Sequence, residues 1–412
     1  MSSRGYLPRW SVLGWVVVLL WTHSLSAESW PGFRGDGTSV WNGPDLPLHW
    51  SDSSNIAWRV ELPGTGQSSP VIRDGHVYLT SVIGLRKELL VVQALNLATG
   101  KELWRFSTNS SAPQAISEMH SQGAPTPVVS ADGVFALFES GDCIALTTEG
   151  RLRWHRPLAA SVGQDTGNHG LGGSPILYER GLFLALDQEG PACLVALDRT
   201  TGNTLWKTPR PGRVGWSTPV VAKNQEEWQI VVSSGSTVAG YDPESGVLRW
   251  EVPGIVKNTV PSPTAAESLL LIGSGSKGSN LALQWAGTPP KPVELWRSSE
   301  ATCGFPSPLL HRARAYFLSK TGVLTCVEAQ SGKLLFSERV GDGGWASPIG
   351  AGDRIYAFGE KTGTTILAAR DQFLPLTTNQ LSFRKPLCGV AAGAGVLVMR
   401  AYEELVCVGT PP

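Results

Sequence analysis

Short apolar runs, interrupted by polar turn residues, follow one another along most of the chain. Segments such as "VIRDGHVYLT", "VVSADGVFAL" and "IGAGDRIYAF" each hold two apolar runs around a polar pair. Such a pair between two alternating runs predicts a β-hairpin. Beyond residue 30, no stretch repeats its apolar residues at the three- and four-residue spacing of an amphipathic helix. The pattern therefore predicts an all-β fold.

An aromatic residue recurs near the end of every unit of the pattern. Members of this series are 40 to 52 residues apart, a period typical of the four-stranded blade of a β-propeller. The series consists of Trp58, Trp104, Trp154, Trp206, Trp250, Trp296, Phe336 and Phe383. A second marker keeps the same period, a Ser-Pro or Thr-Pro pair that starts at Ser69, Thr126, Ser174, Thr218, Ser262, Ser307 and Ser347. Each unit is expected to form strands A, B, C and D, with the proline at the start of strand A.

The two series also predict how the ring closes. There are eight aromatic strand ends but only seven Ser/Thr-Pro starts, and residues 388–409 supply three strands before the chain ends. Residues 55–62 form a strand with no A, B or C strand before it. We therefore predict an eight-bladed propeller of antiparallel four-stranded blades over residues 55–410, closed by the N-terminal strand. Residues 28–54 form an arm whose aromatic residues are expected to pack over the first or last blade.

The repeated residues are expected to serve the fold. A large flat side chain fills the wedge between neighbouring blades, and its ring N–H should find a backbone carbonyl. The glycine four residues before the tryptophan is expected to turn the chain from strand C to strand D.

Function is expected on one face of the ring. Tight A–B and C–D turns lie on one face, here the A–B face, and the longer D–A and B–C loops lie on the other, the D–A face. The candidate ligand-binding residues of the D–A face are Gln67, His120, Gln122, Asn168, His169, Trp216, Asn258, Phe305, Asp342 and Trp345. Aromatic, amide and imidazole groups of this kind suit a peptide or a carbohydrate. Alternatively, Trp216 and Trp345 only plug the central channel.

Composition and the N-terminus narrow the class of protein. Charged residues make up 17% of the chain, and 34 basic residues balance 34 acidic ones, which argues against a nucleic-acid partner. Residues 1–27 combine Arg4 and Arg9, an apolar run over residues 12–21 and small residues, which predicts a signal peptide. A permanent anchor is the alternative, but the run is short for a membrane span. We expect an exported, periplasmic or extracellular monomer with no transmembrane span after cleavage.

The cysteines give no sign of a metal or redox site. No CxxC and no adjacent pair occurs among them. Cys326 and Cys407 lie in apolar strand contexts, where a free thiol packs as a small hydrophobic group. Buried free thiols are expected for most of the six.

At the aromatic units the chain resembles the PQQ-like (pyrroloquinoline quinone) repeat propellers, whose blades carry an Ala-x-Asp-x-x-x-Gly-x-x-x-Trp motif. "ALNLATGKELW" and "ALDRTTGNTLW" carry this motif most closely, and "CVEAQSGKLLF" replaces tryptophan with phenylalanine. The segment "WPGFRG" is similar to an N-terminal arm of secreted, BamB-like members of this family. The resemblance implies an eight-bladed propeller, and the family contains both quinoprotein dehydrogenases and non-catalytic scaffolds.

The resemblance leaves two functions open. Dehydrogenases of the family hold PQQ over a calcium ion, many of them beside a vicinal disulfide, which this chain lacks. Calcium needs several oxygen ligands, yet Asp342 is the only acidic residue of the D–A loops. We therefore expect no catalytic residue, metal or cofactor, and a scaffold that binds a protein or peptide partner. The alternative is a PQQ-dependent dehydrogenase that oxidises an alcohol or a sugar with PQQ and calcium.

Overall fold

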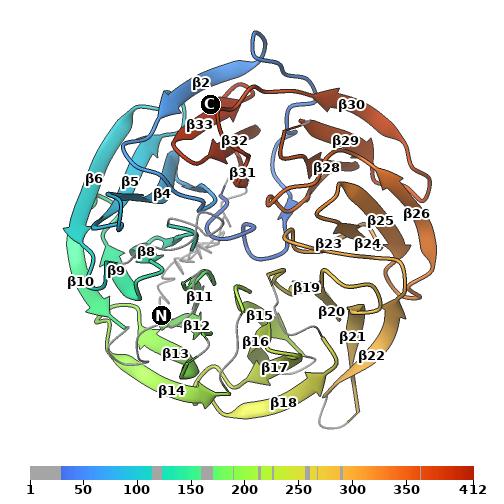
Figure 1. Ribbon diagram of the computed structural model, residues 1–412, viewed down its shortest axis with the longest axis horizontal. Coiled ribbons are helices and arrows are strands. Elements are labelled where there is room, and N and C mark those ends of the chain that lie inside the picture. Colours follow the sequence, from blue (N-terminus) through green and yellow to red (C-terminus); the bar gives the residue numbers. More distant parts are fainter. Residues whose placement is uncertain are drawn as a thin grey trace, which may run out of the picture.

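Eight β-sheets are arranged as blades around a central channel (Figure 1). The computed structural model describes residues 29–113, 123–158, 170–188, 190–211, 215–224, 227–255, 260–266, 268–287, 291–361 and 363–412. All regular structure in these ranges is β-structure, which confirms the predicted all-β, eight-bladed propeller. None of the described residues forms a helix that could span a membrane. The predicted signal peptide, residues 1–27, lies outside the described ranges.

The first four blades follow the chain in order, with strand A innermost and strand D outermost (Figure 1). Blade 1 contains β3 (Val71–Arg73), β4 (His76–Ile83), β5 (Leu89–Asn96) and β6 (Glu102–Asn109). Blade 2 contains β7 (Val128–Ser130), β8 (Gly133–Leu137), β9 (Asp142–Leu146) and β10 (Leu152–Pro157). Blade 3 contains β11 (Ile176–Tyr178), β12 (Gly181–Leu186), β13 (Ala192–Asp198) and β14 (Thr204–Arg210). Blade 4 contains β15 (Val220–Lys223), β16 (Trp228–Ser234), β17 (Thr237–Tyr241) and β18 (Leu248–Pro253).

The remaining blades repeat this arrangement and close the ring. Blade 5 contains β19 (Thr264–Ala266), β20 (Leu269–Ile272), β21 (Asn280–Ala286) and β22 (Lys291–Ser298). Blade 6 contains β23 (Leu309–His311), β24 (Arg314–Leu318), β25 (Val323–Glu328) and β26 (Leu334–Arg339). Blade 7 contains β27 (Ile349–Ala351), β28 (Arg354–Phe358), β29 (Thr364–Ala368) and β30 (Pro375–Asn379). Blade 8 contains β31 (Gly389–Gly393), β32 (Val396–Ala401), β33 (Glu404–Val408) and, from the other end of the chain, β2 (Ile56–Glu61).

The N-terminal strand closes blade 8 as the sequence predicted. β2 pairs antiparallel with β33, and Trp58 lies opposite Cys407 in the register. This pairing joins the two ends of the propeller and leaves no gap between the last blade and the first.

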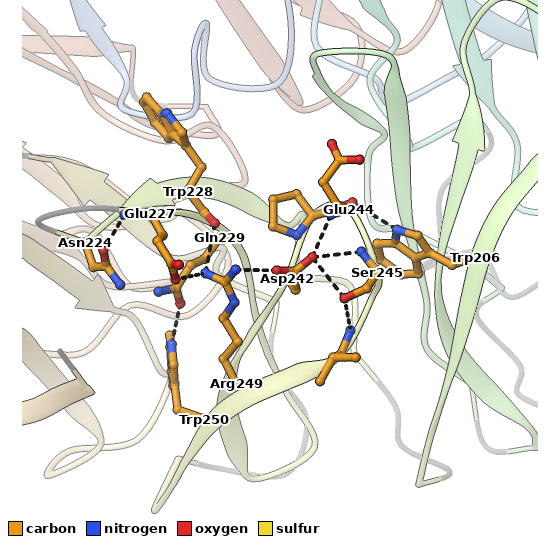
Figure 2. Close-up of polar contacts among 12 residues, drawn as sticks. Trp206, Asn224, Glu227, Trp228, Gln229, Asp242, Glu244, Ser245, Arg249 and Trp250 are labelled. Carbon is orange, nitrogen blue, oxygen red and sulfur yellow. Dashed lines mark hydrogen bonds and ion pairs between the residues drawn. The ribbon is translucent and has the colours of Figure 1, made fainter. Parts of the chain in front are cut away.

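The strand-D tryptophans pack between blades as expected. Five of them donate the indole N–H to a backbone carbonyl of the following blade, namely Trp58 to Leu97, Trp104 to Thr148, Trp154 to Arg199, Trp206 to Pro243 and Trp296 to Ala329. Trp250 is the exception, because its indole donates to the Gln229 side chain (Figure 2). The ring of Trp285 packs edge-on against it at 5.6 Å. The repeat motif is altered in blade 5, which supplies this replacement contact.

The motif glycine lies against the tryptophan of the preceding blade. Gly202 has φ +74°, and a Cβ atom there would lie 2.7 Å from the ring of Trp154. Gly150 and Gly246 have the same relation to Trp104 and Trp206. The glycine therefore provides the turn that the sequence predicted and also leaves room for the neighbouring indole.

The aspartate of the motif shapes the same turn. Asp198 Oδ1 accepts the backbone N–H groups of Thr200 and Thr201, at 3.0 and 2.8 Å. Asn96 accepts the N–H of Thr99 in blade 1 through its amide oxygen. These bonds hold the turn that places each glycine under its indole. All six cysteines are buried and unpaired, although free buried thiols were expected only for most of them. Cys303 and Cys388 lie outside the strands.

Candidate functional site

The N-terminal arm crosses the central channel, where Figure 1 shows the dark-blue segment. Trp30 forms an antiparallel bridge with Ile72 of blade 1. Further along, β1 (Val40–Trp41) pairs parallel with β27 and adds a fifth strand to blade 7. The buried core around Trp30 also includes residues of blade 8 such as Val390. The arm thus contacts the first and last blades, as expected. It also crosses the central channel of the ring.

Arg34 fastens the arm to the far side of the channel. Its guanidinium donates to the carbonyl oxygens of Pro263 and Pro308, at 3.1 and 3.2 Å, and to the Thr264 hydroxyl. The side chain is 4% exposed, and burial lowers the pKa of Arg34 to about 10. A buried cation that is bonded to carbonyl and hydroxyl oxygens holds this geometry firmly, because leaving those groups unpaired is costly.

A belt of hydroxyl groups surrounds the channel. It is built from the Ser/Thr-Pro positions, where each backbone N–H donates to the hydroxyl oxygen of the next blade at 2.9–3.0 Å. The belt runs from Ser69 through Thr126, Ser174, Thr218, Ser262 and Ser307 to Ser347. Sequence reasoning assigned only the proline a role at these positions and missed the hydroxyl. The strict recurrence of Ser or Thr before the proline was the signal.

A cavity opens on the D–A face at the mouth of the channel. This D–A cavity has a volume of about 190 Å³. Its lining includes Gln67, Trp216, Phe305 and Trp345, so four of the predicted residues are brought together. The rings of Phe305 and Trp345 stack at 4.0 Å with an interplanar angle of 9°. These four side chains converge because they precede equivalent inner strands of four different blades.

Two of the lining side chains are held by polar contacts. The Trp216 indole N–H donates to the carbonyl of Gly170 at 3.2 Å. The Gln67 amide donates to the Tyr402 hydroxyl at 2.5 Å. Both side chains are partly exposed, so their remaining surface faces the cavity mouth. A ligand on this face would contact apolar aromatic rings and a few polar groups whose orientation is held by hydrogen bonds.

The other predicted residues do not line the D–A cavity within the described structure. Asp342 accepts the backbone N–H groups of Glu360 and Lys361, at 2.9 and 3.0 Å, and so joins two loops. Five predicted residues lie outside the described ranges: His120, Gln122, Asn168, His169 and Asn258.

Sequence reasoning missed Phe33 of the arm, which also lines the D–A cavity. This residue separates the D–A cavity from a second, larger cavity on the opposite face, because it lines both. The sequence marked "WPGFRG" as a recognisable segment, but no periodicity places it inside the channel.

A buried ion pair lies in the B–C loops of the D–A face. Lys87 Nζ is 3.5 Å from Glu139 Oε1, and both side chains are nearly inaccessible. Glu139 also accepts the backbone N–H of Gly123 at 3.0 Å. Burial raises the pKa of Glu139 and lowers that of Lys87, while each charge counteracts the shift of the other. The pair joins blades 1 and 2, and no pattern in the sequence indicated it.

Known propeller proteins are similar to this chain in sequence. A family model described as outer membrane protein assembly factor BamB matches residues 18–169, 164–284 and 290–372. The chain belongs to this family of PQQ-like propellers. BamB of Yersinia pestis is 21% identical over 263 residues, which are 62% of this chain and 61% of that protein.

A dehydrogenase is among the relatives of this BamB-family chain. Polyvinylalcohol dehydrogenase of a Pseudomonas species is 22% identical over 262 residues, which are 55% of this chain and 39% of that protein. The chain therefore spans less than two thirds of the length of either relative. The crystal structure of BamB from Moraxella catarrhalis has a TM-score of 0.63 at 13% identity, covering 86% of this chain and 97% of that one. That likeness shows the fold alone.

The described lining of the D–A cavity offers no charged partner for PQQ in this BamB-family chain. PQQ is a tricarboxylate, and a buried carboxylate needs a cation or several hydrogen-bond donors. No lining residue in the described ranges carries a charged side chain. The described residues also hold no group of three or more His, Cys, Asp or Glu side chains that could bind a metal ion.

Proposed function

We propose that this chain is an exported, non-catalytic scaffold that binds a protein or peptide partner on its D–A face. The observation that carries the proposal is the uncharged, aromatic D–A cavity, lined by Trp216, Phe305 and Trp345. Aromatic rings with few polar groups are typical of the centre of a protein interface. The similarity to assembly factor BamB supports the same class of function.

Loss of partner binding tests this proposal. The mature chain, residues 28–412, is compared with Trp216→Ala and Trp345→Ala variants in quantitative copurification from cells that make it. We expect the partner recovered with the wild type to fall at least about tenfold with either variant, as for a central interface residue. Leu248→Ala, which truncates a half-exposed apolar side chain of the outer strand β18 away from both cavities, is the control and should retain the partner. Equal recovery with all four proteins would contradict the proposal.

A PQQ-dependent dehydrogenase is the second candidate, and the similarity to polyvinylalcohol dehydrogenase is the observation in its favour. Calorimetric titration of residues 28–412 with PQQ and calcium separates the two functions. We expect no saturable heat. Saturable, calcium-dependent binding would replace the scaffold by a quinoprotein, and alcohols and sugars would then be screened with an electron-accepting dye.

Export is part of the same proposal. The predicted signal peptide supports a periplasmic or extracellular location, and sequencing the N-terminus of the secreted protein tests it. We expect cleavage after Ser26 or Ala27. An intact Met1 in the mature protein would contradict it.

A further inference from the structure

The inner strands of several blades form backbone hydrogen bonds with the arm. In a two-residue hairpin the closing pair is hydrogen-bonded, so the residue one position before it directs its N–H and C=O to the opposite edge of the strand. That edge faces the channel, because strand A is innermost. The N–H groups of Ile72, Val129 and Gly350 hold this position in β3, β7 and β27, and they donate to the arm carbonyls of Trp30, Pro31 and Ser39 at 2.8–3.0 Å.

Leu177 occupies the same position in β11. Tyr178 and Gly181 close the hairpin between β11 and β12, so the N–H and C=O of Leu177 point toward the channel. The arm forms no backbone hydrogen bond with β11 within the described residues. All three residues of β11 are partly exposed, whereas every other inner strand has at least one buried residue. Blade 3 thus presents an open strand edge where blades 1, 2 and 7 present an occupied one.

This open edge faces a channel cavity that is larger than the D–A cavity. The A–B cavity has a volume of about 460 Å³ and lies on the A–B face, on the other side of Phe33 from the D–A cavity. Leu177 and Val221 of the inner strands line it, together with residues 31–37 of the arm. The volume is in the range of cavities that bind a compact ligand or a short peptide segment.

Two aromatic rings stand at the rim of the A–B cavity. Trp228 is 42% exposed, and the Tyr178 ring lies 5.6 Å from it. Figure 2 shows the Trp228 ring pointing away from the polar network in which its backbone takes part, where the Trp228 carbonyl accepts a hydrogen bond from Arg249. Lys223 Nζ lies over the Trp228 ring, 5.4 Å from its centroid. The indole surface that remains exposed beside the open strand edge can stack with an aromatic or proline side chain.

The arginines of the cavity do not favour an anionic ligand. Arg73 is paired with Asp74 at 3.0 Å, and Arg199 is paired with Asp132 at 2.7 Å. The guanidinium of Arg34 turns to blades 5 and 6, where its bonds lie. The carboxylates of Asp36 and Glu179 also line the cavity, so it suits a segment without acidic side chains.

We propose that the inner edge of β11 binds an extended segment of a partner protein, without acidic side chains, by β-strand addition, with an aromatic or proline side chain of that segment stacked on Trp228. The arm already shows this mode at Ile72, which exchanges two hydrogen bonds with Trp30. Backbone bonds to Leu177 supply affinity, and the Trp228–Tyr178 pair supplies side-chain selection. This site lies on the face opposite the D–A cavity and does not depend on the function proposed there.

Peptide selection on the whole mature chain tests the site. The probe is a phage-displayed library of random dodecapeptides, from which binders are synthesised and titrated against residues 28–412. Leu177→Pro removes the N–H from the open edge, where proline is tolerated in a strand. Trp228→Ala removes the stacking surface and, at an exposed position, leaves the fold intact. We expect both variants to weaken the selected peptides at least about tenfold, whereas Trp345→Ala on the other face leaves them unchanged.

Amide hydrogen exchange locates the contact. The Leu177 amide should exchange faster in the free protein than the arm-bonded amides of Ile72 and Val129, and a bound peptide should slow it specifically. The proposal is overturned if no peptide is selected, if the peptides bind Leu177→Pro as tightly as the wild type, or if Leu177 exchange does not change. Peptides that lose affinity only with Trp345→Ala would also overturn it, while supporting the D–A face as the binding site.

Discussion

Replacing Gly202 with alanine tests the contact that ties one blade to the next. Gly202 has φ +74°, and the new Cβ would lie 2.7 Å from the Trp154 ring. Gly75 provides a matched control, because its φ is +72° and nothing lies within 4 Å of its added Cβ. Alanine at either site incurs the left-handed backbone strain, about 1–2 kcal/mol. Only Gly202→Ala also crowds the buried indole, which costs about 1–3 kcal/mol more.

The assay is chemical denaturation of the mature chain, followed by tryptophan fluorescence and circular dichroism together. We expect Gly202→Ala to lower the free energy of unfolding by about 2–5 kcal/mol and Gly75→Ala by about 1–2 kcal/mol. In a Trp154→Ala background the Gly202 substitution should cost no more than the Gly75 substitution. The packing role would be refuted if Gly202→Ala and Gly75→Ala lowered the free energy of unfolding of the wild type by amounts that agree within about 0.5 kcal/mol. Effects of independent substitutions are additive to about that precision.

Three further changes test the belt, the arm and the turns. Ser174→Ala leaves the buried N–H of Thr126 without an acceptor and should lower the free energy of unfolding by about 1–3 kcal/mol. Ser174→Thr keeps a hydroxyl and should preserve the wild-type stability. Equal losses of stability in the two variants would contradict the role assigned to the hydroxyl. Arg34→Ala should speed amide exchange throughout the arm while exchange in the outer strands is unchanged, and an arm that stays protected would disprove the anchor. The pKa of Asp198 lies below its ordinary value of 3.8, chiefly because the N–H of Thr201 stabilises the carboxylate. Its contribution to stability is present above pH 3.8 and is lost as the pH falls through the lower folded pKa. The melting temperature of Asp198→Asn should therefore depend less on pH between pH 4 and 2 than that of the wild type. An unchanged pH dependence would contradict this.

The hydrophobic pattern was sufficient for the blades. A hairpin such as β3–β4 joins residues only a few positions apart, so its alternation and its Asp-Gly turn are visible in a single stretch. The closure by β2 was also predictable, because a blade with three strands and a strand without a blade require one another. The convergence of Gln67, Trp216, Phe305 and Trp345 followed from their equivalent places in the repeat.

Contacts between blades were less accessible to sequence reasoning. The periodicity predicted that Gly202 lies in a turn and that Trp154 lies between blades, but it did not predict that the two residues contact each other. That contact depends on how far each blade is rotated relative to its neighbour, which no alternation within a strand specifies. The hydroxyl belt was not predicted for the same reason, because the Ser174 hydroxyl accepts a hydrogen bond from the backbone N–H of Thr126 in another blade.

The sequence by itself determined the number of blades, their strand order and the ring closure, because each depends on patterns that are local or strictly periodic. The tertiary structure alone decided where the arm lies and which strand edges remain open. Arg34 bonds to Pro263 and Pro308, which are 229 and 274 residues away, and the arm has no repeat that could reveal such partners. The position of Phe33 in the channel, and with it the division into two cavities on opposite faces, exists only once the ring has closed around the arm.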